Sequence, residues 1–273
     1  MGEERIKDFR AAECPAWRWS REGEWREVAE VVVVEQPVTI YLNGQELITL
    51  LCTPEYLEDL AVGFLAGEGF LTLPQDLESV SADYQKGQVW VSAARQDLLT
   101  SGTFLKRYLS TGCGKGTGFY SFDDARRLKP LAKSLRVSPL EVLALVQRLQ
   151  ECSQLFRATG GVHSGALGKG EELAVFREDL GRHNAVDKII GCCWRQKIEA
   201  RQYMLAVSGR VASEILLKAA KAGIEVLVSC SAPTRLAVEW AQQLGITLIG
   251  FVRGGRFNVY THPERIEGCS RRE

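Results

Sequence analysis

The sequence has little of what marks a membrane, nucleic-acid-binding or zinc-ribbon protein. No apolar run approaches the ~20 residues of a transmembrane helix, and the first ten residues contain no apolar signal core. Lys and Arg number 34, as do Asp and Glu, so the zero net charge does not favour a broad nucleic-acid surface. None of the eight cysteines forms a C-x-x-C pair, so the zinc-ribbon and thioredoxin patterns are absent. We therefore expect a cytoplasmic protein with mostly reduced thiols and with neither membrane nor nucleic acid as a partner.

The N-terminal part predicts an arm followed by a small sheet-rich domain. Residues 1–26 are charged and show no sustained period, so we expect an extended arm whose three tryptophans lie across the body or a second subunit. In the predicted domain, residues 27–109, β-rich runs flank Asn43-Gly44, which is typical of a hairpin turn. Thr53-Pro54 predicts the start of a helix, with Thr53 as its N-cap.

The C-terminal part, residues 123–273, alternates strands and helices after about Phe156. Ser138 opens a capping box for a helix that reaches about Cys152. Strands separated by single helices predict right-handed crossovers and a largely parallel sheet covered by helices, with ligands at the carboxyl ends of the strands. We expect an α/β fold, α+β overall, with a three-layer α/β/α C-terminal domain. The predicted strands are 165–168, 173–177, 203–207, 224–228, 247–251 and 257–260, and the predicted helices are 123–128, 138–152, 184–195, 211–222 and 234–244.

Residues 110–122 form a glycine-rich loop around Cys113. Glycines at 112, 114, 116 and 118 permit positive φ and leave the sulfur and several N–H groups free to face one partner. Lys115 is the kind of neighbour that lowers a thiol pKa. Because free cysteines are more often small buried hydrophobes, the loop alone leaves both a reactive and an incidental thiol open.

Five polar loops follow or precede the predicted strands, and four of their arginines, at 182, 210, 253 and 256, stand beside a glycine. Glycine or serine before a helix start, beside an arginine, is how proteins build anion sites, so together these loops predict phosphate binding. We expect His183 to be a capping or otherwise satisfied side chain, with Asp187 one turn later orienting its ring. The loops are 159–163, 177–184, 208–210, 229–234 and 251–257.

A hydrolytic alternative rests on His183, which enters a helix as the metal-binding histidine of zinc-dependent nucleobase deaminases does. Those enzymes have a glutamate two residues later and a Pro-Cys-x-x-Cys at the next helix. This chain has Ala185 at the first position and Ser208-Gly209-Arg210 at the second. The fold is compatible with that class, whereas the metal ligands and the proton shuttle are missing, so no metal is expected.

Taken together, these segments resemble the formate dehydrogenase accessory sulfurtransferase family (FdhD). The resemblance runs from about Glu35 to Arg265, and an eleven-residue run and the last segment make chance agreement remote. The segments that carry it are 42–44, 53–54, 63–65, 68–69, 113–114, 159–163, 178–188, 208–210, 231–234, 250–251 and 256–260.

The resemblance implies a sulfurtransferase that works as a sulfur carrier and homodimer, with a cytidine-deaminase-like C-terminal domain. A cysteine desulfurase loads sulfur as a persulfide on the residue that matches Cys113. The carrier passes it to the molybdenum cofactor, a bis(molybdopterin guanine dinucleotide), before that cofactor enters formate dehydrogenase; a guanine nucleotide such as GDP is a partial mimic. The cofactor-binding segment corresponds to Phe251, Val252, Arg253, Gly254, Gly255 and Arg256.

One departure affects the mechanism. Many members of the family carry Cys-Gly-x-Cys in this loop, whereas this chain has Gly116 at the second position, so Cys113 must act alone. Two alternatives stay open: a chaperone that holds a guanine-containing cofactor without chemistry at Cys113, and a hydrolase that acts on a nucleotide ring. Zinc analysis, GDP binding and sulfur labelling of Cys113 distinguish the three.

Overall fold

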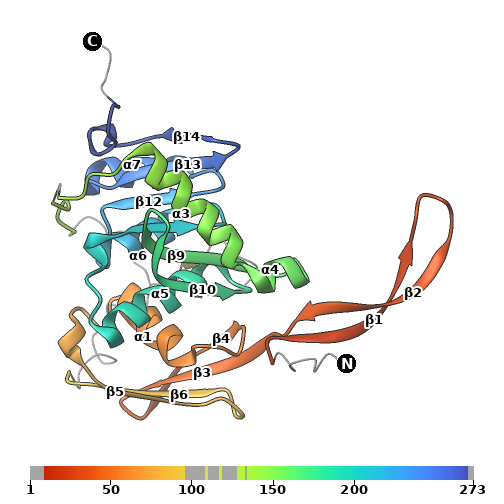
Figure 1. The fold of residues 1–273 in the computed structure, drawn as a ribbon. Helices are drawn as coiled ribbons and strands as arrows, with labels where there is room; N and C mark the ends of the chain where they lie inside the picture. Colours follow the sequence, from red (N-terminus) through yellow and green to blue (C-terminus); the bar gives the residue numbers. More distant parts are fainter. Residues whose placement is uncertain (1–8, 96–107, 110–116, 119–127, 133, 270–273) are drawn as a thin grey trace.

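The computed structural model of the protein describes residues 9–95, 108–109, 117–118, 128–132 and 134–269 (Figure 1). β11, β12 and β13 of its largest sheet are parallel, and the outer strands run antiparallel to their neighbours. The six strands lie in the order β10 (Glu172–Asp179), β9 (His163–Lys169), β11 (Met204–Val207), β12 (Val226–Ser229), β13 (Thr247–Arg253) and β14 (Arg256–Val259).

The prediction of a largely parallel sheet was therefore wrong for half of its strands. Only Gly170 and Glu171 separate β9 from β10, and only Gly254 and Gly255 separate β13 from β14. A parallel pair needs a crossover of a dozen or more residues, whereas two residues make an antiparallel hairpin. Crossovers with single helices join only β11, β12 and β13.

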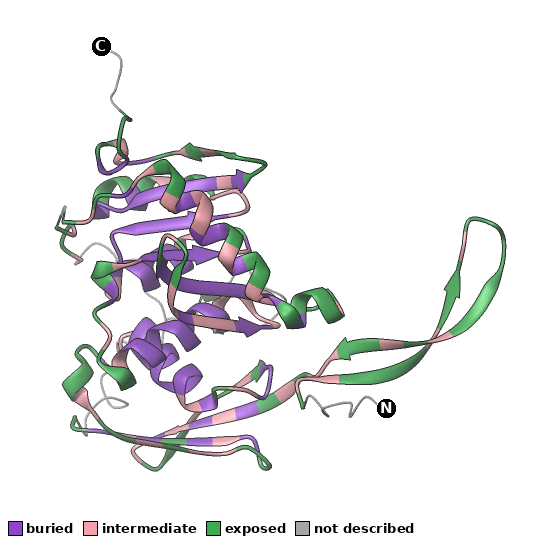
Figure 2. Ribbon diagram, viewed as in Figure 1, coloured by how far each residue is buried: buried purple, intermediate pink, exposed green. Residues whose placement is uncertain are grey.

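Helices cover both faces of this sheet, as predicted, because successive side chains of each strand point to opposite faces. Met204 and Ala206 of β11 pack in one core with α3 (Pro139–Cys152). Leu205 and Val207 pack in the other core with α5 (Arg182–Gln196), α6 (Ser213–Lys221) and α7 (Arg235–Leu244). The three-layer α/β/α arrangement is thus confirmed, and the strands between the helices are buried along their length (Figure 2).

The capping prediction for α3 is also confirmed. The Ser138 hydroxyl accepts from the Glu141 backbone N–H at 3.2 Å, and the Glu141 carboxylate accepts from the Ser138 N–H at 2.8 Å. A short helix, α4 (Gln154–Thr159), follows, and 3₁₀ turns occur at Pro74–Asp76, Ala200–Gln202 and Pro263–Arg265. The helix predicted at 123–128 lies almost wholly outside the described residues.

A second, four-stranded sheet and α1 (Leu57–Glu68) form a separate core. Asn43 and Gly44 have φ of 49° and 79°, as the predicted hairpin turn requires. The helix start was wrong: α1 begins at Leu57, and Thr53 is buried with its hydroxyl bonded elsewhere. The strands lie in the order β4 (Gln45–Cys52), β3 (Gln36–Leu42), β6 (Gln88–Ala93) and β5 (Leu77–Asp83).

α1 and α5 cross in backbone contact, and this contact joins the two cores. A Cβ at Gly63 would lie 1.8 Å from the carbonyl oxygen of Asp187, and one at Gly191 would lie 1.9 Å from that of Asp59. No other residue type fits at either position with the helices where they are. The layers therefore run from α3 through the large sheet, α5 and α1 to the small sheet (Figure 1).

The N-terminal segment is a long two-stranded hairpin formed by β1 (Ala11–Trp19) and β2 (Trp25–Val33), which we call the hairpin arm. It projects away from the body (Figure 1). Trp17, Trp19 and Trp25 are 67%, 54% and 64% exposed, so the prediction that they pack across the body was wrong within this chain. The domain boundaries inferred from the sequence stay predictions.

Candidate functional site

The five polar loops meet at one edge of the six-stranded sheet, which we call the candidate edge. β10, β11, β12 and β13 end there, at Asp179, Val207, Ser229 and Arg253. The antiparallel strands β9 and β14 begin there, because His163 pairs with Asp179 and Arg256 pairs with Arg253. The expectation that the loops share one side of the sheet is confirmed although the sheet is mixed.

Asp179 organises the turn between β10 and α5. Its Oδ2 lies 2.6 Å from Nζ of Lys188, and both side chains are fully buried. Thr53 donates to the same oxygen at 3.0 Å and accepts from Lys188 at 2.8 Å. Oδ1 accepts from the Gly181 N–H at 2.8 Å and from the Asn184 amide at 2.9 Å. This buried carboxylate therefore fixes the start of α5, and with it the position of Arg182 and His183 at the candidate edge.

Three loops come into contact at the middle of the edge. A Cβ on Gly209 would lie 3.2 Å from Nδ1 of His163 and 3.5 Å from Cβ of Arg182. Burial, then the charges of Arg182 and His183, lower the pKa of His163. His163 is therefore neutral at pH 7, so it can both donate and accept a hydrogen bond.

His183 pairs with α6 and not with Asp187, which corrects the sequence-based expectation. Its Nε2 lies 2.9 Å from Oε2 of Glu214. Burial opposes ionisation of Glu214, but the hydrogen bond and charge of His183 lower its pKa overall. Asp187 instead accepts two bonds from buried Lys218 of α6, at 2.7 and 2.6 Å.

The loops after β11 and β12 are bonded to each other and to β13. The Val211 N–H donates to Ala232 O at 3.1 Å, and the Thr234 N–H donates to Val211 O at 2.9 Å. The Phe251 N–H donates to Ser231 O at 3.0 Å, so β13 is bonded to the loop that follows β12. Much of the polarity of these loops thus serves to lock them together, and it leaves Arg210 exposed at the surface.

The segment 251–256 is a hairpin turn and not an open loop. Gly254 and Gly255 have φ of 57° and 74°, and a bulge after Gly250 gives Phe251 a φ of 55°. Arg253 and Arg256 pair across the turn with both side chains exposed, and the Arg253 guanidinium lies 5.5 Å from the Phe251 ring. The Val252 side chain is buried, so only its backbone can contact a ligand. Two guanidinium groups beside two exposed glycines suit a phosphate-bearing ligand.

Cys113 lies outside the described residues. The flanking strands β7 (Tyr108–Leu109) and β8 (Thr117–Gly118) pair antiparallel, so residues 110–116 connect two paired strands. Among the described cysteines, burial raises the pKa of Cys52 and of Cys193 to about 12 and also raises that of Cys192 and Cys230. These four thiols are therefore protonated at pH 7 and poorly suited to nucleophilic attack. Cys192 and Cys193 pack in the core, as predicted.

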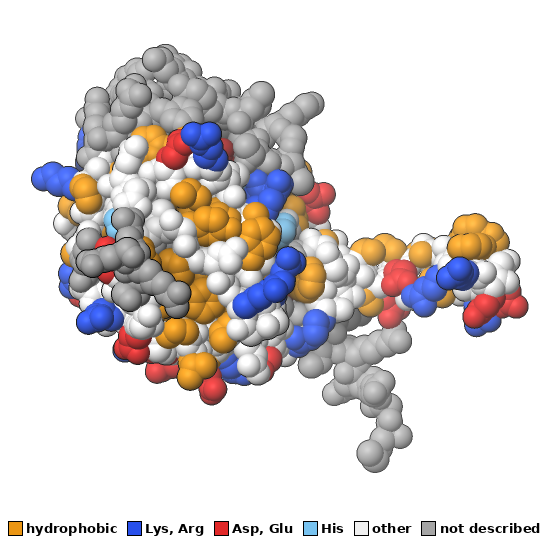
Figure 3. Space-filling model, turned by 90° about the horizontal axis from the view of Figure 1, so that it is seen from above, with side chains coloured by type: hydrophobic (Ala, Val, Ile, Leu, Met, Phe, Trp, Pro, Cys, Tyr) orange, Lys and Arg blue, Asp and Glu red, His pale blue; other side chains and the backbone are white. Residues whose placement is uncertain are grey.

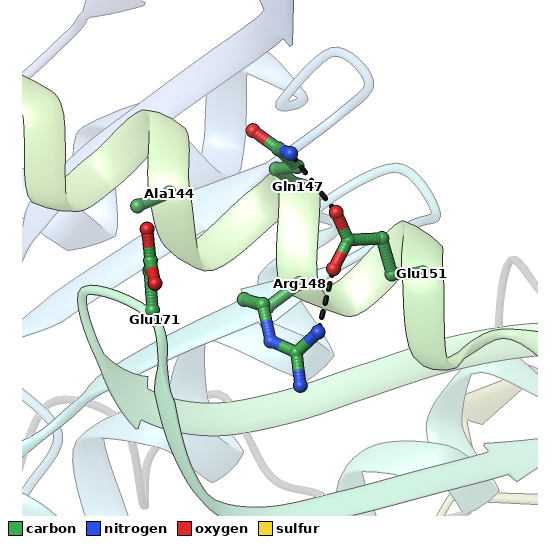
Figure 4. Close-up of a pocket in the computed structure, with 5 residues that line it drawn as sticks. All are labelled: Ala144, Gln147, Arg148, Glu151 and Glu171. Carbon is green, nitrogen blue, oxygen red and sulfur yellow. Dashed lines mark hydrogen bonds and ion pairs between the residues drawn. The ribbon is translucent and has the colours of Figure 1, made fainter.

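A surface depression of about 380 Å³ lies elsewhere, between α3 and the β9–β10 turn (Figure 4). Gln147 and Arg148 both bond to Glu151 there, at 2.9 and 2.6 Å. Since the β9–β10 turn is at the opposite edge of the sheet, this depression is separate from the candidate edge. Within the described ranges, no cluster of three or more His, Cys, Asp or Glu residues suits a metal ion, and no helix is long and apolar enough to cross a membrane.

The model of the FdhD/NarQ family matches residues 33–267. The chain belongs to the FdhD/NarQ family. Two relatives are named "Sulfur carrier protein FdhD". The protein from Bacillus subtilis is 44% identical over 250 residues, which cover 92% of this chain and 95% of its own. That from Geobacillus kaustophilus is 42% identical over 261 residues, 96% of this chain and 99% of its own.

The fold agrees with this family. A crystal structure of a proposed formate dehydrogenase accessory protein from Desulfotalea psychrophila superposes with a TM-score of 0.79 at 26% identity. It covers 94% of this chain and 99% of its own. The FdhD/NarQ match begins at Val33, where the hairpin arm joins the body.

Sequence reasoning missed Glu214 and gave Thr53 the wrong role, and both residues shape the candidate edge. Both act through partners distant in sequence, since Thr53 lies 126 residues from Asp179. In the sequence, each of these two residues is marked only as a polar residue next to apolar ones, and this does not identify its partner.

Proposed function

We propose that this protein is a sulfurtransferase of the sulfur-carrier type that serves formate dehydrogenase maturation. The Cys113 thiolate attacks the outer sulfur of a persulfide on a cysteine desulfurase. A new S–S bond forms on Cys113, the donor's S–S bond breaks, and the donor cysteine leaves as a thiolate, so no external oxidant is consumed. The carrier then delivers the outer sulfur to the molybdenum bis(molybdopterin guanine dinucleotide): the S–S bond breaks, Cys113 leaves as a thiolate, and molybdenum(IV) of this substrate supplies the two electrons that make the sulfur a sulfide ligand.

The observation that carries this proposal is the convergence of the five loops on one edge, in a chain whose relatives are named sulfur carriers. The cofactor is a substrate with two pyrophosphate groups. Arg253 and Arg256 on paired strands supply guanidinium donors, and Gly254 and Gly255 supply exposed N–H groups. α5, α6 and α7 all begin at this edge, so their N-terminal N–H groups favour anions there.

Sulfur labelling tests the chemical step. The protein is incubated with a cysteine desulfurase and cysteine, and the peptide that contains Cys113 is weighed by mass spectrometry. We expect one added sulfur on that peptide in the wild type and in Cys14→Ala and Cys269→Ala controls, which remove the exposed described cysteines. Wild-type protein that never gains sulfur, or a Cys113→Ala variant that still matures formate dehydrogenase, would overturn the assignment and leave the chaperone alternative.

GDP binding tests the candidate edge without any sulfur chemistry. A charge-assisted hydrogen bond contributes about 1.5–3 kcal/mol, so Arg253→Ser and Arg256→Ser should each raise the Kd for GDP about 10- to 100-fold. Arg148→Ser is the matched control, because Arg148 is a partly exposed arginine beside the depression at the opposite edge. Equal Kd values for all three variants, measured by calorimetry, would place the nucleotide elsewhere.

A further inference from the structure

The hairpin arm presents one face that is apolar and aromatic. Residues that pair directly across two antiparallel strands share a face, and Trp19 pairs with Trp25 while Trp17 pairs with Glu27. We call this the tryptophan face; it has no lysine or arginine. Its residues are Ala11, Glu13, Pro15, Trp17, Trp19, Trp25, Glu27, Ala29, Val31 and Val33.

Such a face calls for a partner surface. A lone two-stranded hairpin is only marginally stable in water, and here the large exposed apolar side chains lie along the arm and at its tip (Figure 3). The opposite face is more polar, since Arg18 pairs with Glu30 and Arg26 lies beside Arg18. The tryptophan face is therefore the side of the arm that gains most from being covered.

The charge of this face matches one part of the same molecule. At the β11–β14 end of the candidate edge, residues 208–212, 230–236 and 251–257 include four arginines and no acidic residue. Arg235 pairs with Glu239 at 2.8 Å, whereas none of the ion pairs among the described residues involves Arg210, Arg253 or Arg256. Tyr260 and Leu236 add apolar surface that is 36% exposed on each. An aromatic face with a carboxylate thus fits an arginine-rich surface, where guanidinium groups also stack on indole rings.

The position of the arm makes a second chain the occupant. A nine-residue strand spans about 30 Å, and the arm extends away from its own body. Its base lies at its own candidate edge, since a Cβ on Gly161 would be 2.8 Å from Val33. Each chain thus offers an arm and a matching edge on the same side, as reciprocal exchange about a two-fold axis requires.

Buried area decides between two ways of pairing. A tryptophan buries about 150–250 Å², so the exposed parts of the three side chains offer about 400 Å² per arm. Two arms packed on each other would bury about 800 Å² in total, which is the size of a crystal contact. Two arms each packed on the partner's body would bury about 1,600 Å², which is typical of a stable interface.

We propose that the hairpin arm of each chain packs its tryptophan face on the partner subunit's β13–β14 end, around the turn 251–256, in a two-fold dimer. The aromatic surface of one chain then lies beside the arginines with which the other holds its ligand. Only this last point rests on the proposed function. The contact itself follows from the charge, reach and area of the arm.

A mixing experiment tests the exchange. The arm variant carries Trp17→Ser, Trp19→Ser and Trp25→Ser, and the edge variant carries Arg253→Glu and Arg256→Glu. Because all five side chains are exposed, both variants should fold, which circular dichroism checks. At about 10 μM we expect the wild type to sediment as a dimer and each variant alone as a monomer, with the dimer Kd raised at least 100-fold. Leu140→Ser, which alters an exposed leucine on α3, is the control and should stay dimeric.

Mixing the two variants is the decisive step. An arm from the edge variant meets an intact edge on the arm variant, so one of the two contacts, about 800 Å² in total, is restored. At the highest concentration at which each variant alone is still a monomer, we therefore expect heterodimers in the mixture, with a Kd between those of the wild type and of the separate variants. A photo-crosslinker in place of Trp19 should then label the 251–260 region of the other chain. A monomeric wild type, an arm variant that stays dimeric, mixtures that stay monomeric, or arm-to-arm crosslinks would each overturn the proposal. Neither cofactor nor sulfur enters the assay, so its failure is distinguishable from failure of the sulfur-carrier assignment.

Discussion

Gly63→Ala should destabilise the protein although it favours helix α1. The new Cβ would lie 1.8 Å from the Asp187 carbonyl oxygen, whereas ordinary contacts begin at 3.4 Å. Both groups belong to helices, so α1 and α5 must separate by about 1.6 Å or distort. Overpacking of this severity costs about 3 kcal/mol of unfolding free energy. The higher helix propensity of alanine over glycine offsets about 1 kcal/mol of that cost. A net loss of about 2 kcal/mol lowers Tm by about 4–8 °C in a chain of this size.

Gly67→Ala on the same helix is the matched control. Its nearest neighbours are side-chain carbons of Lys218, at 3.0–3.2 Å, which can move where a backbone carbonyl cannot. We expect its Tm to be unchanged or slightly raised in calorimetric melts at pH 7. The double variant Gly63→Ala/Gly191→Ala should lose less than the sum of the singles, because helices that are already apart accept the second methyl. Equal Tm values for Gly63→Ala and Gly67→Ala would refute the close crossing.

Two further predictions concern the buried charges. Burial raises the pKa of Asp187 from 3.8 to about 6 despite Lys218, so its protonation stabilises the native state below pH 4 and this contribution is lost as the pH rises through 6. Relative to Asp187→Asn, the wild type should lose about 3 kcal/mol of unfolding free energy between pH 4 and 7 in urea titrations, and parallel pH profiles would contradict this. Thr53→Val removes the hydroxyl between Asp179 and Lys188 and should lower the unfolding free energy by about 1–3 kcal/mol. Thr53→Ser keeps a hydroxyl and should retain most of that stability. A valine variant as stable as the wild type would be contrary evidence.

Local signals in the sequence predicted local structure well. The turn at Asn43-Gly44 and the capping box at Ser138 depend on residues within four positions, and both are confirmed. Thr53 failed as an N-cap because Asp179 and Lys188, distant in sequence, compete for its hydroxyl. The two-residue links at Gly170 and Gly254 were readable as hairpins, but the regular alternation of strands and helices around them favoured a parallel sheet.

The hairpin arm escaped prediction for a different reason. The alternation of apolar and polar residues marks a strand only when one face is buried against a core. Beyond its base, where Val33 lies against Gly161, neither face of the hairpin arm packs on the body, so nothing in this chain requires that pattern along most of β1 and β2. The candidate edge, by contrast, was predictable as a set of loops because each one ends or begins a buried strand. Its internal contacts, such as His183 with Glu214, were not predictable because they join separate helices.

The run 178–188 shows how one segment serves both stability and function. Asp179, Asp187 and Lys188 are buried and bind Thr53, which lies just before α1, and Lys218 of α6, so they fix α5 beside both helices. Arg182 and His183, at the first turn of the same helix, lie at the candidate edge. Any displacement of α1 from α5 must therefore move the cationic start of α5 relative to the β13–β14 turn, which is anchored in a different part of the sheet. On this argument Gly63→Ala should weaken GDP binding as well as stability, although Gly63 lies on α1 and outside the loops of the candidate edge.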